Sequence, residues 1–177
     1  MPNLYSIRNL RKNQWSDVPD KPGTYSWYFP ESCLVDLGIL NHCNINNLLL
    51  KNNEGMLCLY HGYTSNLKKR IVWHSAQKLR QSNLKHGTLS TFRFTLLSLL
   101  ELNYSDAEEA LNNFMDSLEI SWQAFDSKME ARQAETKELK GNYHYPLNIQ
   151  ENRKAELSDF IKYLKSSRKI YKKLNLL

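Results

Sequence analysis

Side chains suited to phosphate chemistry crowd one short segment between Tyr60 and His74. The segment reads YHGYTSNLKKRIVWH and combines phenol, guanidinium and imidazole groups with a glycine that permits either a bulge or close backbone approach to a ligand. A second aromatic segment, which begins at Gly23 and includes Tyr25, precedes it. If the two segments pair as strands, the two tyrosines can face one another across a hairpin. We therefore expect a pocket that binds a phosphate group.

The elements that would position these groups are strands and helices in mixed order. Residues 23–29 are dense in threonine and aromatic residues, which is typical of a strand, and 56–63 form the next expected strand. Alternating apolar residues predict a third strand over 118–125. Thr64 or Ser65 would cap a helix that runs to about Gln81. Further helices are expected over about 90–102, from 105, over 127–140 and over about 151–173.

Composition indicates one domain with a hydrophobic core. The chain has 177 residues, 41% of them hydrophobic, and its net charge of +6 suits either a polyanionic partner or an ordinary basic surface. Its three cysteines lack the spacing of a zinc site and are expected as reduced thiols. No signal peptide or membrane-spanning apolar run is evident. We therefore predict a cytoplasmic protein, associated with the nucleoid if it is bacterial.

Several short motifs in the same order resemble the GIY-YIG nuclease superfamily. A Gly-x-Tyr strand and a Tyr-x-Gly strand characterise that family, and here they stand as Gly23-Thr24-Tyr25 and Tyr60-His61-Gly62. His61 departs from the aliphatic residue usual at its position. The likeness covers roughly residues 21–150. Its later pieces are Thr64, Leu67, Arg70 and His74 around the following helix, then Glu135 and Pro146-Leu147-Asn148.

The resemblance implies an α/β (α+β) fold, in which helices flank a small, mostly antiparallel central sheet. Residues 1–22 would form an N-terminal leader or a short capping element. Residues 23–150 would form the nuclease-like domain, with inserts at 31–54 and 84–118. Residues 151–177 would add a basic C-terminal helix.

The resemblance also implies a metal-dependent DNA endonuclease that hydrolyses phosphodiester bonds. Arg70 would grip the scissile phosphate through its planar fork. Tyr60 would act as general base or relay, provided that a neighbour lowers its pKa from about 10. Tyr25 would orient that hydroxyl or the water, and His74 would accept the proton or hold a phosphate oxygen. Asn148 would fix the glutamate helix or form a hydrogen bond within the site.

One divalent metal, Mg²⁺ or Mn²⁺, and a single glutamate ligand are implied as well. Such sparse protein ligation fits magnesium, which keeps much of its hydration shell. Glu135 is the preferred ligand because Leu139, one helical turn later, can anchor its helix to the sheet. Glu130 is held in reserve, and Glu138 is a further alternative.

DNA is the expected partner. The sequence contains no separate recognition module, so restriction, mobile-element and repair enzymes all remain open, and a homodimer or a recognition partner could supply specificity. The alternative function is a catalytically inactive GIY-YIG-like module that binds nucleic acid. The basic terminal helix is equally compatible with phosphate binding and with a solvated surface. The expected DNA contacts near the second motif are Lys68, Lys69, Lys78, Arg80 and Lys85.

Overall fold

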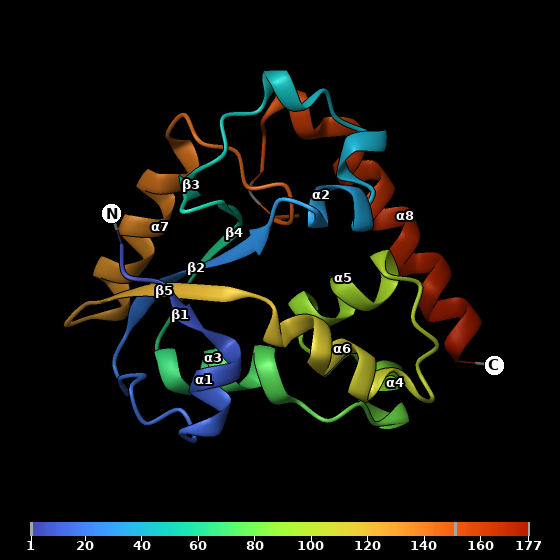
Figure 1. Cartoon of the computed structure of the whole chain (residues 1–177), viewed down its shortest axis with the longest axis horizontal. Helices are drawn as coiled ribbons and strands as arrows, with labels where there is room; N and C mark the ends of the chain where they lie inside the picture. Colours follow the sequence, from blue (N-terminus) through green and yellow to red (C-terminus); the bar gives the residue numbers. More distant parts are fainter. Residues whose placement is uncertain (1, 151, 177) are drawn as a thin grey trace.

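The computed structural model describes residues 2–150 and 152–176, and its centre is one antiparallel sheet (Figure 1). The strand order is β1-β5-β2-β4-β3, and every pair of neighbours is antiparallel. This sheet, with helices on both faces, confirms the expected fold class. The strands are β1 (Tyr5–Ser6), β2 (Gly23–Pro30), β3 (Asn52–Asn53), β4 (Met56–Thr64) and β5 (Glu119–Ala124).

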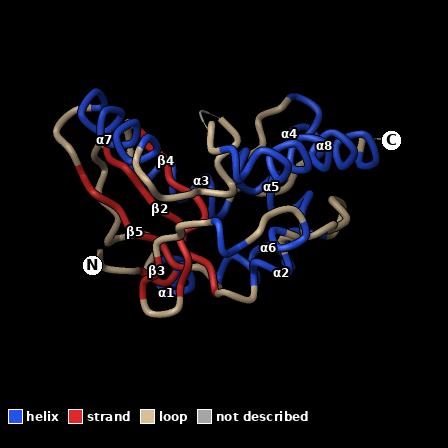
Figure 2. Tube along the Cα trace, turned by 90° about the horizontal axis from the view of Figure 1, so that it is seen from above, coloured by secondary structure: helices blue, strands red, loops and turns tan. Residues whose placement is uncertain are grey.

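Helices cover the sheet on both sides, as Figure 2 shows from above. The long helix α8 lies along α5, where Tyr171 packs against Phe94 with ring centroids 6.0 Å apart. The helices are α1 (Ile7–Lys12), α2 (Cys33–Asp36), α3 (Leu67–Ala76), α4 (Gln81–His86), α5 (Thr91–Leu99), α6 (Ala107–Asp116), α7 (Lys128–Lys140) and α8 (Ser158–Asn175). No helix in the described part of the chain has the length and apolarity needed to span a membrane.

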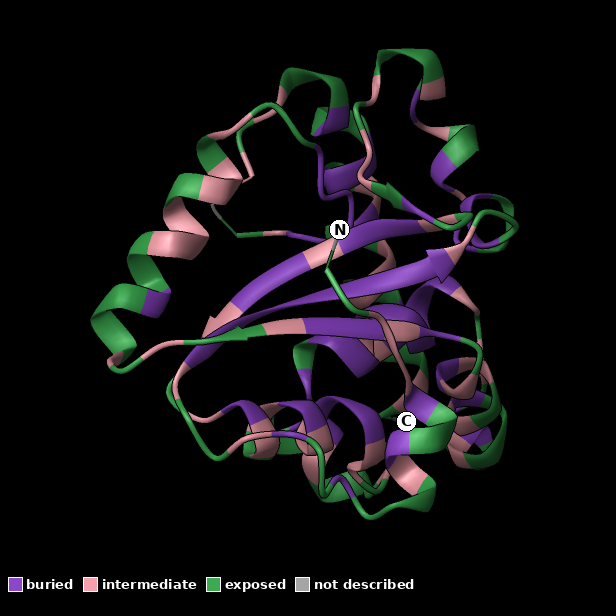
Figure 3. Cartoon of the chain, turned by 60° about the vertical axis from the view of Figure 1, so that its left-hand side comes forward, coloured by how far each residue is buried: buried purple, intermediate pink, exposed green. Residues whose placement is uncertain are grey.

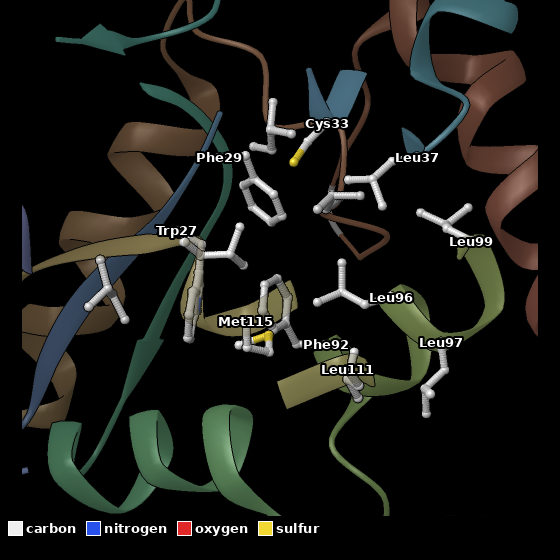
Figure 4. Packing of buried hydrophobic residues seen from close by; sticks show 14 of the residues in the cluster. Trp27, Phe29, Cys33, Leu37, Phe92, Leu96, Leu97, Leu99, Leu111 and Met115 are labelled. Carbon is white, nitrogen blue, oxygen red and sulfur yellow. The ribbon is translucent and has the colours of Figure 1, made fainter. Parts of the chain in front are cut away.

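Side-chain alternation along β2 separates two differently packed faces of the sheet. Trp27 stacks on Phe92 of α5, with ring centroids 4.7 Å apart, on the face covered by α3, α5 and α6. Ser26, its neighbour, faces the opposite side, toward α7, and forms a 2.8 Å hydrogen bond with Nδ1 of His61. Figure 4 shows the larger core around Trp27, where α5 and α6 contribute Phe92, Leu96, Leu97, Leu111 and Met115.

The core draws on more of the chain than the motif-bearing segments. Within 84–118, α5 and α6 supply fully buried side chains, so this segment closes one face of the sheet. Near the N-terminus, β1 pairs with β5, and Ile7 and Leu10 of α1 are buried in the same core. Figure 3 shows that the buried residues continue from the strands into the helices packed beneath them.

Two helix boundaries differ from those expected. The helix after β4 is capped by Asn66, whose Oδ1 accepts the N–H of Lys69 at 2.8 Å, instead of by Thr64 or Ser65. It ends at Ala76 because Gln77 adopts an extended conformation, with φ −60° and ψ 126°. The last helix begins at Ser158, well after the expected start, and residue 151 lies outside the described part. The expected strands over 23–29, 56–63 and 118–125 are confirmed, as are helices over most of 90–102 and 127–140.

Candidate active site

Strands β2 and β4 bring the two motif tyrosines together. Their register pairs Tyr25 with Gly62 and Trp27 with Tyr60, and the two tyrosine ring centroids lie 6.1 Å apart. A Cβ atom at Gly62 would stand 3.0 Å from Oη of Tyr25. The glycine therefore leaves the space in which the Tyr25 hydroxyl lies against β4.

Behind the tyrosines, α3 places His74 in the protein interior. His74 is 1% exposed, and its Nε2 lies 3.0 Å from Oη of Tyr25. Burial lowers the pKa of His74 well below its ordinary value, and the positive charges of Arg70 and Arg93 lower it further. The imidazole is therefore neutral, so it can orient Tyr25 without adding positive charge.

Tyr60 is half-buried and lies at the wall of a cavity. Burial raises the pKa of Tyr60, although a hydrogen bond with Tyr25 and the charge of Arg70 act to lower it. Burial also raises the pKa of Tyr25 well above its usual value, and the interaction with Tyr60 adds to that rise. Tyr25 and Arg70 thus act to lower the pKa of Tyr60, as expected of its neighbours, but the opposite effect of burial is larger.

The cavity beside Tyr60 has a volume of about 320 Å³ and is formed by segments far apart in the sequence. Glu135 of α7 and Asn148 line it together with Tyr60. Asn148 fastens its segment to β4: its Oδ1 accepts the N–H of His61 at 2.9 Å, and its Nδ2 donates to the His61 carbonyl at 2.7 Å. The Asn148 side chain therefore forms the two backbone hydrogen bonds at His61 that a neighbouring strand would otherwise form.

Arg70 lies one helical turn before His74 and is half-buried. Its guanidinium carbon is 4.9 Å from the ring centroid of Trp73. Arg70 is outside the set of cavity-lining residues, but its charge lowers the pKa of Tyr60 and of Tyr25. Its positive charge therefore acts on the same group of side chains.

The three candidate glutamates occupy different surroundings on α7. Glu135 is half-buried and lines the cavity. Glu138 is outside the set of cavity-lining residues; it forms an ion pair with Lys51 at 2.8 Å and accepts a hydrogen bond from the Tyr145 hydroxyl. Glu130 lies exposed in the first turn of the helix. This geometry favours Glu135 as the carboxylate of the site.

His61 lies away from this cavity, on the face of the sheet toward α7. Its Nδ1 forms the hydrogen bond with Ser26. Burial lowers the pKa of His61 to about 4 and so favours the neutral imidazole. The neighbouring Glu138 opposes this shift, and Lys51 adds to it. His61, the departure from the usual aliphatic residue, is therefore outside the set of residues that line the cavity.

The five basic residues expected to contact DNA lie outside the cavity. Lys68 and Lys69 line a shallow hollow beside Trp73 on the outer face of α3, while Lys78, Arg80 and Lys85 are exposed on the segment that leads into α4 and on α4 itself. The sequence reasoning passed over Arg132, which lines the cavity. Its position three residues before Glu135 was the available signal, because that spacing puts both side chains on one helix face.

Comparison with protein families adds an independent observation. The family model described as GIY-YIG catalytic domain matches residues 23–170, which include the sheet strands β2, β4 and β5, the helix with Glu135 and much of α8. The chain belongs to the GIY-YIG family. Neither a curated protein nor a solved structure matches it.

Membership makes the chain a nuclease-family protein and DNA the substrate class that the domain implies. GIY-YIG nucleases generally use divalent metals. Among residues 2–150 and 152–176, no three histidine, cysteine, aspartate or glutamate side chains gather closely enough to hold a metal together.

Proposed function

We propose that this GIY-YIG domain is a metal-dependent DNA endonuclease that hydrolyses phosphodiester bonds. The observation that carries the proposal is the convergence of Tyr60, Glu135 and Asn148 on one cavity. These residues come from β4, α7 and the segment after α7. Simple core packing would have no need for a phenol and a carboxylate beside the same solvent-accessible space.

In the proposed reaction, Tyr60 takes a proton from the attacking water. Tyr60 lines the cavity, and its interaction with Tyr25 favours the deprotonated form of Tyr60. Arg70 favours the same form by its charge and supplies a planar fork for a phosphate oxygen. His74 holds Tyr25 from the interior and stays neutral.

The donor set around the cavity fits a hard divalent cation such as Mg²⁺ or Mn²⁺. Glu135 would hold the ion through its carboxylate, and the cavity leaves room for the water ligands that Mg²⁺ retains. When bound, the ion would polarise a phosphate oxygen and offset the charge that develops during hydrolysis. Among the described residues that line the cavity, none carries a thiol or an imidazole, so a zinc site is a poor fit.

Two arginines on the cavity wall suit the DNA backbone on either side of the scissile bond. Arg132 comes from α7, and Arg168 comes from α8. The Arg168 guanidinium lies 4.8 Å from the Phe94 ring centroid, and partial burial lowers its pKa while leaving it a cation. Both guanidinium groups place positive charge and planar hydrogen-bond donors on the cavity wall, which suits phosphate binding.

Replacing Arg168 by glutamine should weaken DNA binding about tenfold and reduce the salt dependence by about one phosphate contact. Lys165→Gln is the matched control, because it removes the same charge from an exposed position on α8. Fluorescence anisotropy with labelled duplex DNA, in EDTA and over a range of salt concentrations, measures both effects. Equal losses in the two variants would show that α8 contributes only general charge.

Incubation with supercoiled plasmid tests the proposed function directly. Purified protein should nick the plasmid with Mg²⁺ or Mn²⁺, stop in EDTA and recover when metal is restored. Salt-sensitive DNA binding without nicking in either metal would instead support the inactive binding module. Sequencing the cleaved ends from a random DNA pool would then show whether the enzyme has sequence preference.

A cytoplasmic location and a homodimer or recognition partner remain predictions from the sequence.

A further inference from the structure

A buried chain of hydrogen bonds runs from the cavity into the interior and ends at Ser90. His74 contacts Tyr25 through Nε2 at 3.0 Å and Ser90 Oγ through Nδ1 at 2.7 Å. Ser90 is 0% exposed and caps α5, where its Oγ accepts the N–H of Arg93 at 3.3 Å. At its outer end, the Tyr25 ring lies beside that of Tyr60, with centroids 6.1 Å apart, and the interaction with Tyr25 lowers the pKa of Tyr60.

The direction of the bonds follows from what each group can donate. The Ser90 hydroxyl has one proton, and among the described residues its Oγ has two partners, the N–H of Arg93 and Nδ1 of His74. The Arg93 N–H is itself a donor, so Nδ1 is the acceptor that satisfies the buried Ser90 proton. Nδ1 then carries no proton, and the proton of the neutral His74 imidazole is on Nε2.

We propose that Ser90 is a positioning residue that sets the hydrogen-bond direction Ser90 to His74 to Tyr25 to Tyr60. This inference rests on the proposed function. With Nε2 protonated, His74 donates to Tyr25, and the Tyr25 proton is then available to Tyr60. With the opposite tautomer, Tyr25 would donate to His74 and could no longer donate to Tyr60. Ser90 therefore stabilises the deprotonated form of Tyr60, which accepts a proton, and it does so through His74 and Tyr25.

The loop before α5 is built to hold Ser90 in this place. Gln77, the residue at which α3 ends, accepts the N–H of Ser90 through Oε1 at 2.6 Å. Its Nε2 donates to the carbonyl of Thr88 at 2.9 Å. Gln77 directly follows α3, which carries His74, and its side chain binds the loop that carries Ser90. It therefore holds the His74 imidazole and the Ser90 hydroxyl in place relative to one another.

Nuclear magnetic resonance tests the direction in the full chain without metal or substrate. Long-range proton–nitrogen spectra of nitrogen-labelled protein should show His74 protonated at Nε2 and bare at Nδ1, with the signals assigned by their loss in His74→Gln. A proton on Nδ1 of the wild-type protein would overturn the proposal. This result is independent of nicking, so a protein that fails to nick would contradict the proposed function alone.

Kinetics test whether the direction matters. Ser90→Ala should lower kcat for plasmid nicking about tenfold and leave KM unchanged, whereas Ser90→Thr, which keeps both the cap and the hydroxyl donor, should restore kcat. Thermal unfolding of both variants checks that they are folded at the assay temperature. A folded Ser90→Ala protein with wild-type kcat would reduce Ser90 to a helix cap and overturn the proposal.

Discussion

Glu135→Gln should lower metal-dependent nicking by about 10³-fold while leaving DNA binding intact. The variant keeps the size of the side chain and removes the negative charge that would hold a divalent ion beside Tyr60. Metal ions contribute several kcal/mol to such reactions, and each 1.4 kcal/mol corresponds to about tenfold in rate. Nicking rates over a range of Mg²⁺ concentrations, together with anisotropy in EDTA, measure the two properties separately.

Glu130→Gln is the control for this prediction. It makes the same chemical change on the same helix, at a position exposed to solvent. Its nicking rate should remain within a factor of about two of the wild type, since an exposed charge of this kind has a small effect. Loss of nicking in Glu130→Gln, with normal nicking in Glu135→Gln, would reassign the metal ligand.

Tyr60→Phe should reduce nicking by about 10² to 10⁴-fold, the range that general acid–base catalysis contributes. The change removes the hydroxyl and keeps the ring, which packs 5.1 Å from Phe92 between centroids, so the fold should be preserved. Because burial raises the pKa of Tyr60, the wild-type rate should also rise with pH as the phenol loses its proton. Plasmid nicking against pH checks both expectations.

Tyr63→Phe supplies the matched control for Tyr60. Tyr63 lines the same cavity and is half-buried, but it lies beyond Gly62 on the strand and outside the hydrogen-bonded chain that links Tyr60 to His74. The Tyr63→Phe protein should therefore keep most of its activity. If both variants lose activity equally, the hydroxyls contribute through substrate binding and Tyr60 has no special role as a base.

Much of the architecture could be predicted from local patterns in the sequence. Aromatic and alternating residues indicated the strands over 23–29 and 118–125, and both formed because their inner faces pack on α3, α5 and α6. The end of α3 was harder to predict. Nothing in the local helical pattern stops at Ala76; the helix ends there because the Gln77 side chain binds the loop at Thr88 and Ser90, which follows it by more than ten residues.

The sequence by itself indicated the family and nominated the two tyrosines, Arg70 and His74 as site residues. Only the tertiary structure showed that Glu135, the glutamate preferred from the sequence, lines the same cavity as Tyr60. Glu130, Glu135 and Glu138 lie within nine residues, and local spacing cannot say which of them packs beside β4 and which pairs with Lys51. The contact of Ser90 with His74 and the position of Arg168 on the cavity wall likewise depend on segments that are close in space and distant along the chain.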